Sequence, residues 1–174
     1  RWNRVYTSSA YTDTYLEATG LVDGTYKVYA VDTSGNLSNA SRNTVTVDTT
    51  APTANFSAAT DDVGNFTGAL TSGSTTDDTA LVLSGTNESG SSVMVYKSSP
   101  ELGAATVSGT SWSYSATVTN GTTYQFNVKE TDLAGNTSNA TTKFAVTGDT
   151  TAPNGTSIML SRASGITEKL RNAD

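Results

Sequence analysis

Residues 21–52 read LVDGTYKVYAVDTSGNLSNASRNTVTVDTTAP, and residues 118–153 read VTNGTTYQFNVKETDLAGNTSNATTKFAVTGDTTAP. Both stretches carry, in the same order, a Gly-Thr turn, an alternating apolar run, Asp-x-x-Gly-Asn, Ser-Asn-Ala, a second apolar run and Asp-Thr-Thr-Ala-Pro. From Asp to Pro the second copy is one residue longer, and Gly148 is the candidate for the inserted residue. A repeat with this many matched positions predicts two copies of one structural unit.

Between the two Asp-Thr-Thr-Ala-Pro segments, the apolar residues alternate with polar ones. The clearest runs are Trp112–Val118 and Tyr124–Val128, in which every second side chain is apolar. Period-two alternation, turn residues between the runs and a unit of about 100 residues predict an all-β fold: an immunoglobulin-like, two-sheet antiparallel β-sandwich of about seven strands. The first strand is expected at Thr53–Ala58. The side chains expected to be buried are Trp112, Tyr114, Phe126, Val128 and Phe144.

The repeats also divide the chain. We expect residues 1–50 to be the C-terminal part of one repeat, residues 51–150 a complete repeat, and residues 151–174 the start of a following one, in a linear array. Pro52 and Pro153 favour short, stiff linkers because proline fixes φ and extends the residue before it. An incomplete unit at 1–50 leaves an apolar face for a neighbouring chain or another copy to cover. Residues 166–171 (ITEKLR) are compatible with one helical turn.

Composition excludes several function classes. The chain of 174 residues has no Cys and no His, which removes thiol nucleophiles, His-based triads and most transition-metal sites. A net charge of −6, from 16 acidic and 10 basic residues, argues against binding to nucleic acid or insertion into anionic membranes. No apolar run approaches the ~20 residues that a membrane helix needs. The paired aspartates lie in expected turns and not in an apolar cleft, so no enzyme activity is predicted.

Further motifs link the chain to a known family. The central unit contains TDDVG (60–64), a second TDD (76–78), LSGTNESGSSVMVY (83–96) and TDLAGN (131–136). With the DTTAP segments, this order resembles the bacterial immunoglobulin-like tandem repeats of giant surface adhesins exported by type I secretion. The resemblance implies an extracellular location on the bacterial cell surface and Ca²⁺ bound at the junctions between repeats. It implies neighbouring repeats of the same or an adjacent chain as partners.

The order of strands indicates where the aspartates gather. The loop before the last strand of such a sandwich lies at the pole where the chain enters, and the turn after the first strand lies at the opposite pole. Carboxylates from distant segments would then meet at domain junctions. A hard cation relieves their repulsion, and Ca²⁺ tolerates irregular oxygen ligation better than Mg²⁺. The candidate metal ligands are Asp32, Asp48, Asp61, Asp62, Asp77, Asp78, Asp132 and Asp149. The alternative interpretation makes Asp-x-x-Gly-Asn a plain turn, with Asn36 and Asn136 in left-handed geometry.

Together these features predict a non-catalytic stalk segment of an extracellular adhesin or filament. Its sandwiches would be stiffened by calcium and would support cell adhesion or biofilm formation. Two alternatives remain open. One is a carbohydrate- or protein-binding sandwich, with Met94, Tyr96 and Tyr29 as the candidates for an exposed platform. The other is a self-assembling surface filament or S-layer, in which strands of a neighbouring chain complete the first unit.

Overall fold

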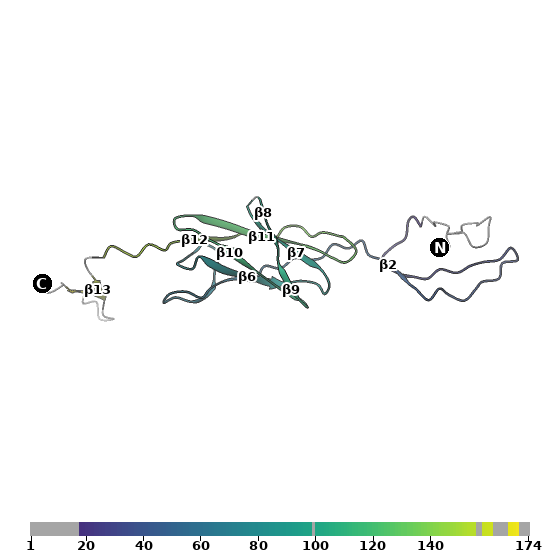
Figure 1. The fold of residues 1–174 in the computed structure, drawn as a ribbon, viewed down its shortest axis with the longest axis horizontal. Helices are drawn as coiled ribbons and strands as arrows, with labels where there is room; N and C mark the ends of the chain where they lie inside the picture. The colour runs from purple at the N-terminus through teal and green to yellow at the C-terminus, as the bar shows by residue number, and fades with distance from the viewer. Residues whose placement is uncertain (1–17, 99, 156–157, 162–166, 171–174) are drawn as a thin grey trace.

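The computed structural model describes residues 18–98 and 100–155 together with the strands at 158–161 and 167–170. A central sandwich lies between two short two-stranded sheets, and extended linkers join it to them at opposite ends (Figure 1). We call the end that receives the chain from residue 51 the N-terminal pole. The end from which the chain leaves at residue 150 is the C-terminal pole. Loops at these two poles are therefore the parts of the sandwich that face the neighbouring units.

One sheet of the sandwich has the order β4-β3-β6-β10-β9. Its strands are β3 (Ala58–Asp61), β4 (Gly68–Leu70), β6 (Ala80–Thr86), β9 (Thr106–Ser108) and β10 (Ser111–Thr117). All pairs in this sheet are antiparallel, and β10 pairs with β6 over its full length, from Ser111 opposite Thr86 to Thr117 opposite Ala80. Trp112 thereby lies opposite Gly85.

The second sheet has the order β5-β12-β11-β7-β8. Its strands are β5 (Ser74–Thr76), β7 (Ser92–Lys97), β8 (Glu101–Ala104), β11 (Thr123–Thr131) and β12 (Phe144–Gly148). The pairs are antiparallel except that β5 runs parallel to β12, placing Thr76 beside Gly148 at the start of the outgoing linker. The expected all-β, two-sheet immunoglobulin-like sandwich is confirmed, although its two sheets have five described strands each and not about seven in all.

The core lies between these sheets and follows the predicted alternation. Trp112, Phe126 and Val128 are buried as expected, whereas Tyr114 and Phe144 are half-buried at the edge of the core. Phe56 fills the space beside Trp112, with the two rings in an edge-to-face arrangement at 5.7 Å. Aromatic packing of this kind adds to the burial of apolar area that holds the sheets together.

Two sequence predictions need correction. The first strand is not Thr53–Ala58: β3 begins at Ala58, and the preceding segment packs Phe56 onto the core without joining a sheet. The helical turn expected at 166–171 is also wrong where the structure describes it. Thr167–Leu170 forms β14, antiparallel to β13 (Ile158–Ser161). A single turn has no cooperative support as a helix, whereas a strand of four residues gains a ladder from its neighbour.

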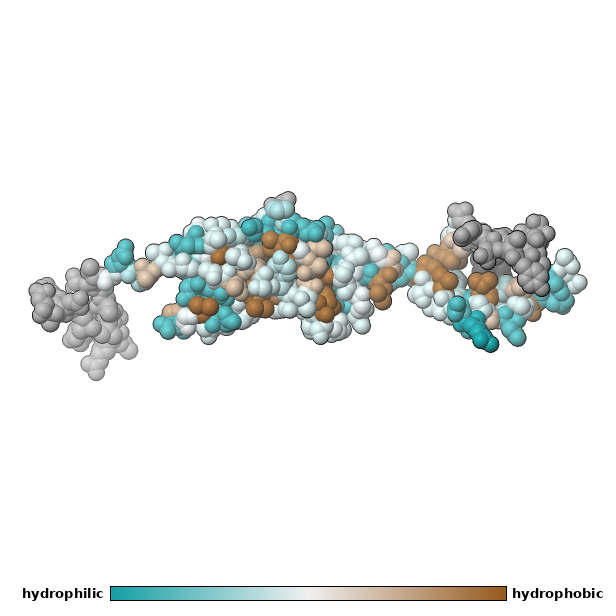
Figure 2. All heavy atoms as spheres, in the orientation of Figure 1, coloured by the Kyte–Doolittle hydropathy of each residue, from teal (hydrophilic) through white to brown (hydrophobic). Residues whose placement is uncertain are grey.

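The first unit is described from residue 18 onward. Its sheet pairs β1 (Gly24–Tyr26) with β2 (Val45–Val47), three residues each, in antiparallel register. Several apolar side chains of this unit are exposed, among them Val22, Val28, Leu37 and Val45, and Figure 2 shows brown surface on this unit beside the linker. That a neighbouring chain, or another copy of this chain, covers these side chains remains a prediction.

Gly148, the candidate inserted residue, ends β12 against a backbone neighbour. An ideal Cβ on Gly148 would lie 2.5 Å from the Thr119 carbonyl oxygen, and its N–H donates to the Thr122 carbonyl. Since backbone cannot rotate away as a side chain can, we expect Gly148→Ala to destabilise the sandwich by about 1–3 kcal/mol in thermal or urea unfolding. Gly155→Ala is the control, because nothing lies within 4 Å of its added Cβ. Equal stability of the two variants would contradict this close approach.

Candidate functional site at the domain junctions

Both linkers begin with the same aspartate turn. Asp48 accepts the Thr50 N–H at 3.0 Å through Oδ1, and Asp149 accepts the Thr151 N–H at 3.0 Å in the same way. An aspartate that bonds the backbone two residues ahead fixes a local turn. The Asp-Thr-Thr segment therefore shapes the start of each linker without any ligand.

In each repeat, the residue before the Gly-Thr turn anchors the linker that follows that repeat. Asp23 Oδ1 accepts both the N–H (2.9 Å) and the hydroxyl (2.6 Å) of Thr49, and its Oδ2 accepts the Thr50 hydroxyl at 2.8 Å. In the second copy Asn120 Oδ1 accepts the Thr150 N–H at 2.8 Å, and Asn120 Nδ2 donates to the Thr151 hydroxyl at 2.9 Å. Sequence reasoning missed both anchors. The shared position before Gly-Thr was the available signal.

These hydrogen bonds also act on the charge of Asp23. The hydroxyls of Thr49 and Thr50 favour the carboxylate and lower the pKa of Asp23 below its ordinary value. The anchored form of the first linker is therefore the ionised form.

The Asp-x-x-Gly-Asn segments form closed turns. In each copy the aspartate, Asp32 or Asp132, accepts the backbone N–H of the asparagine four residues ahead through Oδ1, at 2.8 Å. It accepts the same residue's Nδ2 through Oδ2, at 2.7 Å in the first copy and 2.9 Å in the second. The asparagine side chain is the largest cause of the lowered pKa of both aspartates.

The left-handed residue of each turn is glycine. Gly35 has φ 93° and Gly135 has φ 95°, whereas Asn36 and Asn136 do not have positive φ. The alternative interpretation of these segments as turns is thus right about the turn and wrong about its left-handed residue. Glycine takes that conformation at the lowest steric cost.

At the N-terminal pole, the second of these turns reaches the incoming linker. Asn136 Nδ2, held by Asp132, also donates to the Asp48 carbonyl oxygen at 3.0 Å. Asp132 lies in the loop before the last strand, which the strand order predicts at this pole, and Asn136 joins it to Asp48. Asp132 thus positions a linker contact across the junction.

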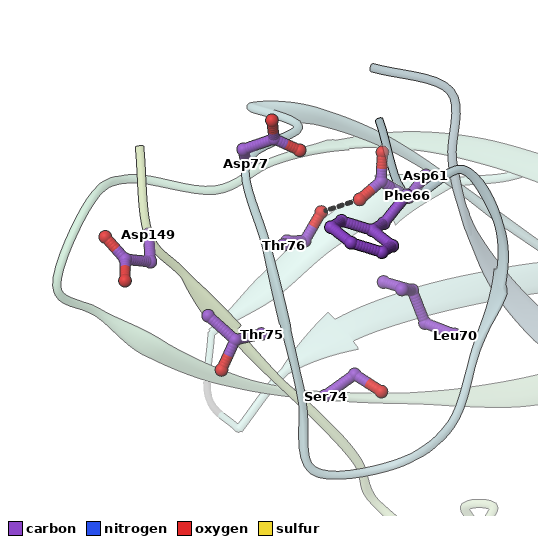
Figure 3. A pocket seen from close by; sticks show the side chains of 8 residues that line it. All are labelled: Asp61, Phe66, Leu70, Ser74, Thr75, Thr76, Asp77 and Asp149. Carbon is purple, nitrogen blue, oxygen red and sulfur yellow. Dashed lines mark hydrogen bonds between the residues drawn. The ribbon is translucent and has the colours of Figure 1, made fainter. Parts of the chain in front are cut away.

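At the C-terminal pole, three of the predicted aspartates line one pocket of about 360 Å³. Asp61, Asp77 and Asp149 line it from three separate segments, together with Phe66 and Leu70 (Figure 3). Asp61 is buried and accepts the Thr76 hydroxyl at 2.6 Å, while the backbone N–H of Asp149 donates to the Thr76 carbonyl at 2.7 Å.

The other predicted residues lie elsewhere. Asp62 is exposed and does not line the pocket, and Asp32 lies in a turn of the first unit. Asp78 is 2% exposed: its Oδ1 accepts the Ala80 N–H, and its Oδ2 is buried with no hydrogen-bond partner. The structure therefore gathers three of the eight candidates at one place and links two more through Asn136.

Residues 51–150 match the family described as bacterial Ig-like domain. The chain belongs to this family. No curated protein and no solved structure matches the chain significantly. Bacterial Ig-like domains commonly occur in extracellular or surface proteins and are typically non-catalytic.

The bacterial Ig-like unit at 51–150 offers oxygen ligands of the kind that Ca²⁺ accepts at its C-terminal pole. An ideal Cβ on Gly64 would lie 2.3 Å from Asp77 Oδ2, so the glycine makes room for that carboxylate, and Asp78 Oδ2 is an unpartnered oxygen nearby in the chain. Within the described residues, no group of three or more Asp, Glu, His or Cys is arranged to hold a metal by itself. A calcium ion at this pole would therefore need further oxygen ligands beside these carboxylates.

The structure adds little support for the alternative in which this bacterial Ig-like unit carries an exposed binding platform. Met94 and Tyr96 are half-buried, and the Lys129 ammonium lies 5.9 Å from the centre of the Tyr96 ring. Tyr29 of the first unit is 40% exposed. Across the described residues, no helix has the length and apolar character to span a membrane.

Proposed function

We propose that this chain is a non-catalytic segment of an extracellular bacterial surface adhesin or filament. In it, tandem Ig-like units are held in line, and Ca²⁺ at the junctions stiffens them for cell adhesion or biofilm formation. The observation that carries the proposal is the repeated linker. In two copies an Asp-Thr-Thr turn is anchored by the residue before Gly-Thr. Asn136 contacts the incoming linker at one pole of the central unit, and three carboxylates line a pocket at the other.

The linker contacts support a mechanical role. Hydrogen bonds hold each linker to the unit that precedes it. Asn136 of the central unit also donates a hydrogen bond to the incoming linker. Pro52 is buried, so the first residues after the junction pack onto the sandwich. Anchoring at both sides of a short linker restricts the angle between neighbouring units, which is what a stalk needs.

Calcium would add to this restriction at the C-terminal pole. Asp61, Asp77 and Asp149 would hold it, with the remaining ligands from the chain beyond Pro153. The ion would neutralise carboxylates at this pole of a unit, residues 51–150, whose only cationic side chains are Lys97, Lys129 and Lys143. Extracellular sites bind Ca²⁺ with Kd of about 10⁻⁴–10⁻³ M. At ten times Kd one site contributes about 1.4 kcal/mol, which is small against folding and large against bending of a linker.

The test is small-angle scattering of the full chain with calcium and after chelation. We expect chelation to widen the distribution of interdomain angles, to lower the melting temperature slightly and to leave the β-sheet circular dichroism unchanged. Because the core of the central unit is built from apolar side chains, loss of the fold is not expected. An unchanged scattering profile, with no calcium binding in calorimetry, would overturn the calcium part of the proposal.

Two aspartate variants locate the effect. Asp77→Asn keeps the shape of a side chain at the pocket and removes its charge, so it should abolish the calcium response of the second junction. Asp62→Asn removes a neighbouring charge that does not line the pocket, and should keep the response. If both variants lose the calcium response equally, the ion is attracted by the overall negative charge of this pole and is not bound in the pocket.

A further inference from the structure

The core-facing side of β11 ends in a carboxylate. Tyr124, Phe126 and Val128 point into the core, and Glu130 continues the same alternation with 0% of its surface exposed. A buried carboxylate is costly unless it is paired and hydrogen-bonded. In the part of the chain that the structure describes, no lysine or arginine pairs with Glu130.

The loop after β6 satisfies only one oxygen of Glu130. The Glu88 N–H and the Ser91 hydroxyl both lie 2.6 Å from Oε1. Oε2 is buried and has no hydrogen-bond partner. The Ser91 hydroxyl also lies 2.8 Å from the Glu88 carbonyl oxygen, and its single hydrogen can serve only one of these acceptors. The group around Glu130 therefore has more acceptors than donors.

Asn87 adds a second unpartnered oxygen. Its Nδ2 donates to the Glu88 carbonyl at 2.7 Å and reaches the Ser91 hydroxyl oxygen at 3.2 Å and the Gly109 carbonyl at 3.4 Å. These acceptors determine which end of the amide is nitrogen. Oδ1 therefore remains an acceptor, buried and without a donor, on a residue that is 8% exposed. Ser91 contacts Glu130 through Oε1 and Asn87 through Nδ2, so the two residues that carry the unpartnered oxygens belong to one polar group.

We propose that Glu130 Oε2 and Asn87 Oδ1 bind a hard cation, Ca²⁺ or Na⁺, inside the central unit. One carboxylate and neutral oxygens are ligands that such ions take, and an ion bound by both residues would give each unpartnered oxygen a partner. Glu88 takes part only through its backbone, so Glu130 supplies the carboxylate of this group, which is distinct from the carboxylates that line the pocket at the C-terminal pole. Because the oxygens are buried, the ion would be enclosed during folding and exchange slowly, unlike an ion at an exposed junction.

The test measures metal in the full chain. The protein is refolded with calcium, exposed briefly to a chelator, and separated by gel filtration. We expect about one equivalent of calcium per chain to remain and to be released only when the chain is unfolded in guanidinium chloride with chelator. Refolding in parallel with sodium or choline as the sole added cation identifies the ion. If the site takes Na⁺, the melting temperature should be higher in sodium than in choline. If it takes only Ca²⁺, the two melting temperatures should be equal.

Glu130→Gln keeps the side-chain shape and removes the charge. The variant should retain no ion, and its melting temperature should lose the part of the cation-dependent rise that this site supplies. Glu101→Gln, on exposed β8, is the matched control and should retain the ion. Asp77→Asn should also retain it, which separates this site from the junction. If the wild type holds no calcium after chelation and melts alike in sodium and choline, the proposal is wrong, whether or not Glu130→Gln folds.

Discussion

Replacing Trp112 with Ala should cost the central unit about 3–5 kcal/mol of unfolding free energy, as for other large aromatic truncations in cores. Trp112 is 2% exposed and packs edge-to-face on Phe56. Its Nε1–H donates to the Asn55 carbonyl at 2.9 Å, so it also fixes the chain just after the first linker. Truncation removes the ring, leaves a cavity and orphans that carbonyl.

Such a loss could consume most of the stability of a domain of this size, because small domains are stable by only about 5–15 kcal/mol. Urea unfolding of the full chain, followed by circular dichroism in the β-sheet band, measures it. Trp112→Phe keeps an aromatic ring against Phe56 and should recover part of the loss. Tyr96→Ala truncates a half-buried ring on the outer face of the other sheet and should cost far less. If Trp112→Ala is no worse than Tyr96→Ala, Trp112 is not the centre of this core.

The alternation of side chains made this core predictable. Every second residue of β10 and β11 faces inward, and that pattern is local to the sequence. The short strands were not predictable in the same way. β5 consists of Ser-Thr-Thr and owes its extended form to parallel pairing with β12, about 70 residues later in the chain. Such strands depend on contacts that a local pattern does not contain.

The poles were predictable from topology, and the roles of individual residues were not. Strand order placed Asp61, Asp77 and Asp149 at one end, where they share a pocket. Whether an aspartate is free to bind a ligand depends on its local hydrogen bonds, as the closed turn around Asp132 shows. The buried Glu130 did carry a signal, since a carboxylate in the core-facing phase of an apolar strand is unusual.

The first linker should lose its anchor in acid, and the second should keep it. Asp23 holds Thr49 and Thr50 as a carboxylate, and these bonds lower its pKa. A depressed pKa in the folded state means that the anchoring contribution is present in full above the ordinary Asp value. It is lost as the pH falls through the lower, folded value. Asn120 makes the equivalent bonds to Thr150 and Thr151 with an amide, which does not titrate.

The second copy supplies the matched control. Asp23→Asn should keep an anchor like that of Asn120 and remove its dependence on pH, whereas Asp23→Ala should lose the anchor at every pH. The measurement is the Thr49 amide, whose N–H lies 2.9 Å from Asp23 Oδ1. Above the titration we expect its hydrogen exchange to be up to roughly tenfold slower in the wild type than in Asp23→Ala. Thr150 should show no such change with pH. If Thr49 exchanges alike in the wild type and Asp23→Ala at neutral pH, the anchor does not hold the linker in solution, and stiffness at the first junction must come from the Asn136 contact or from calcium.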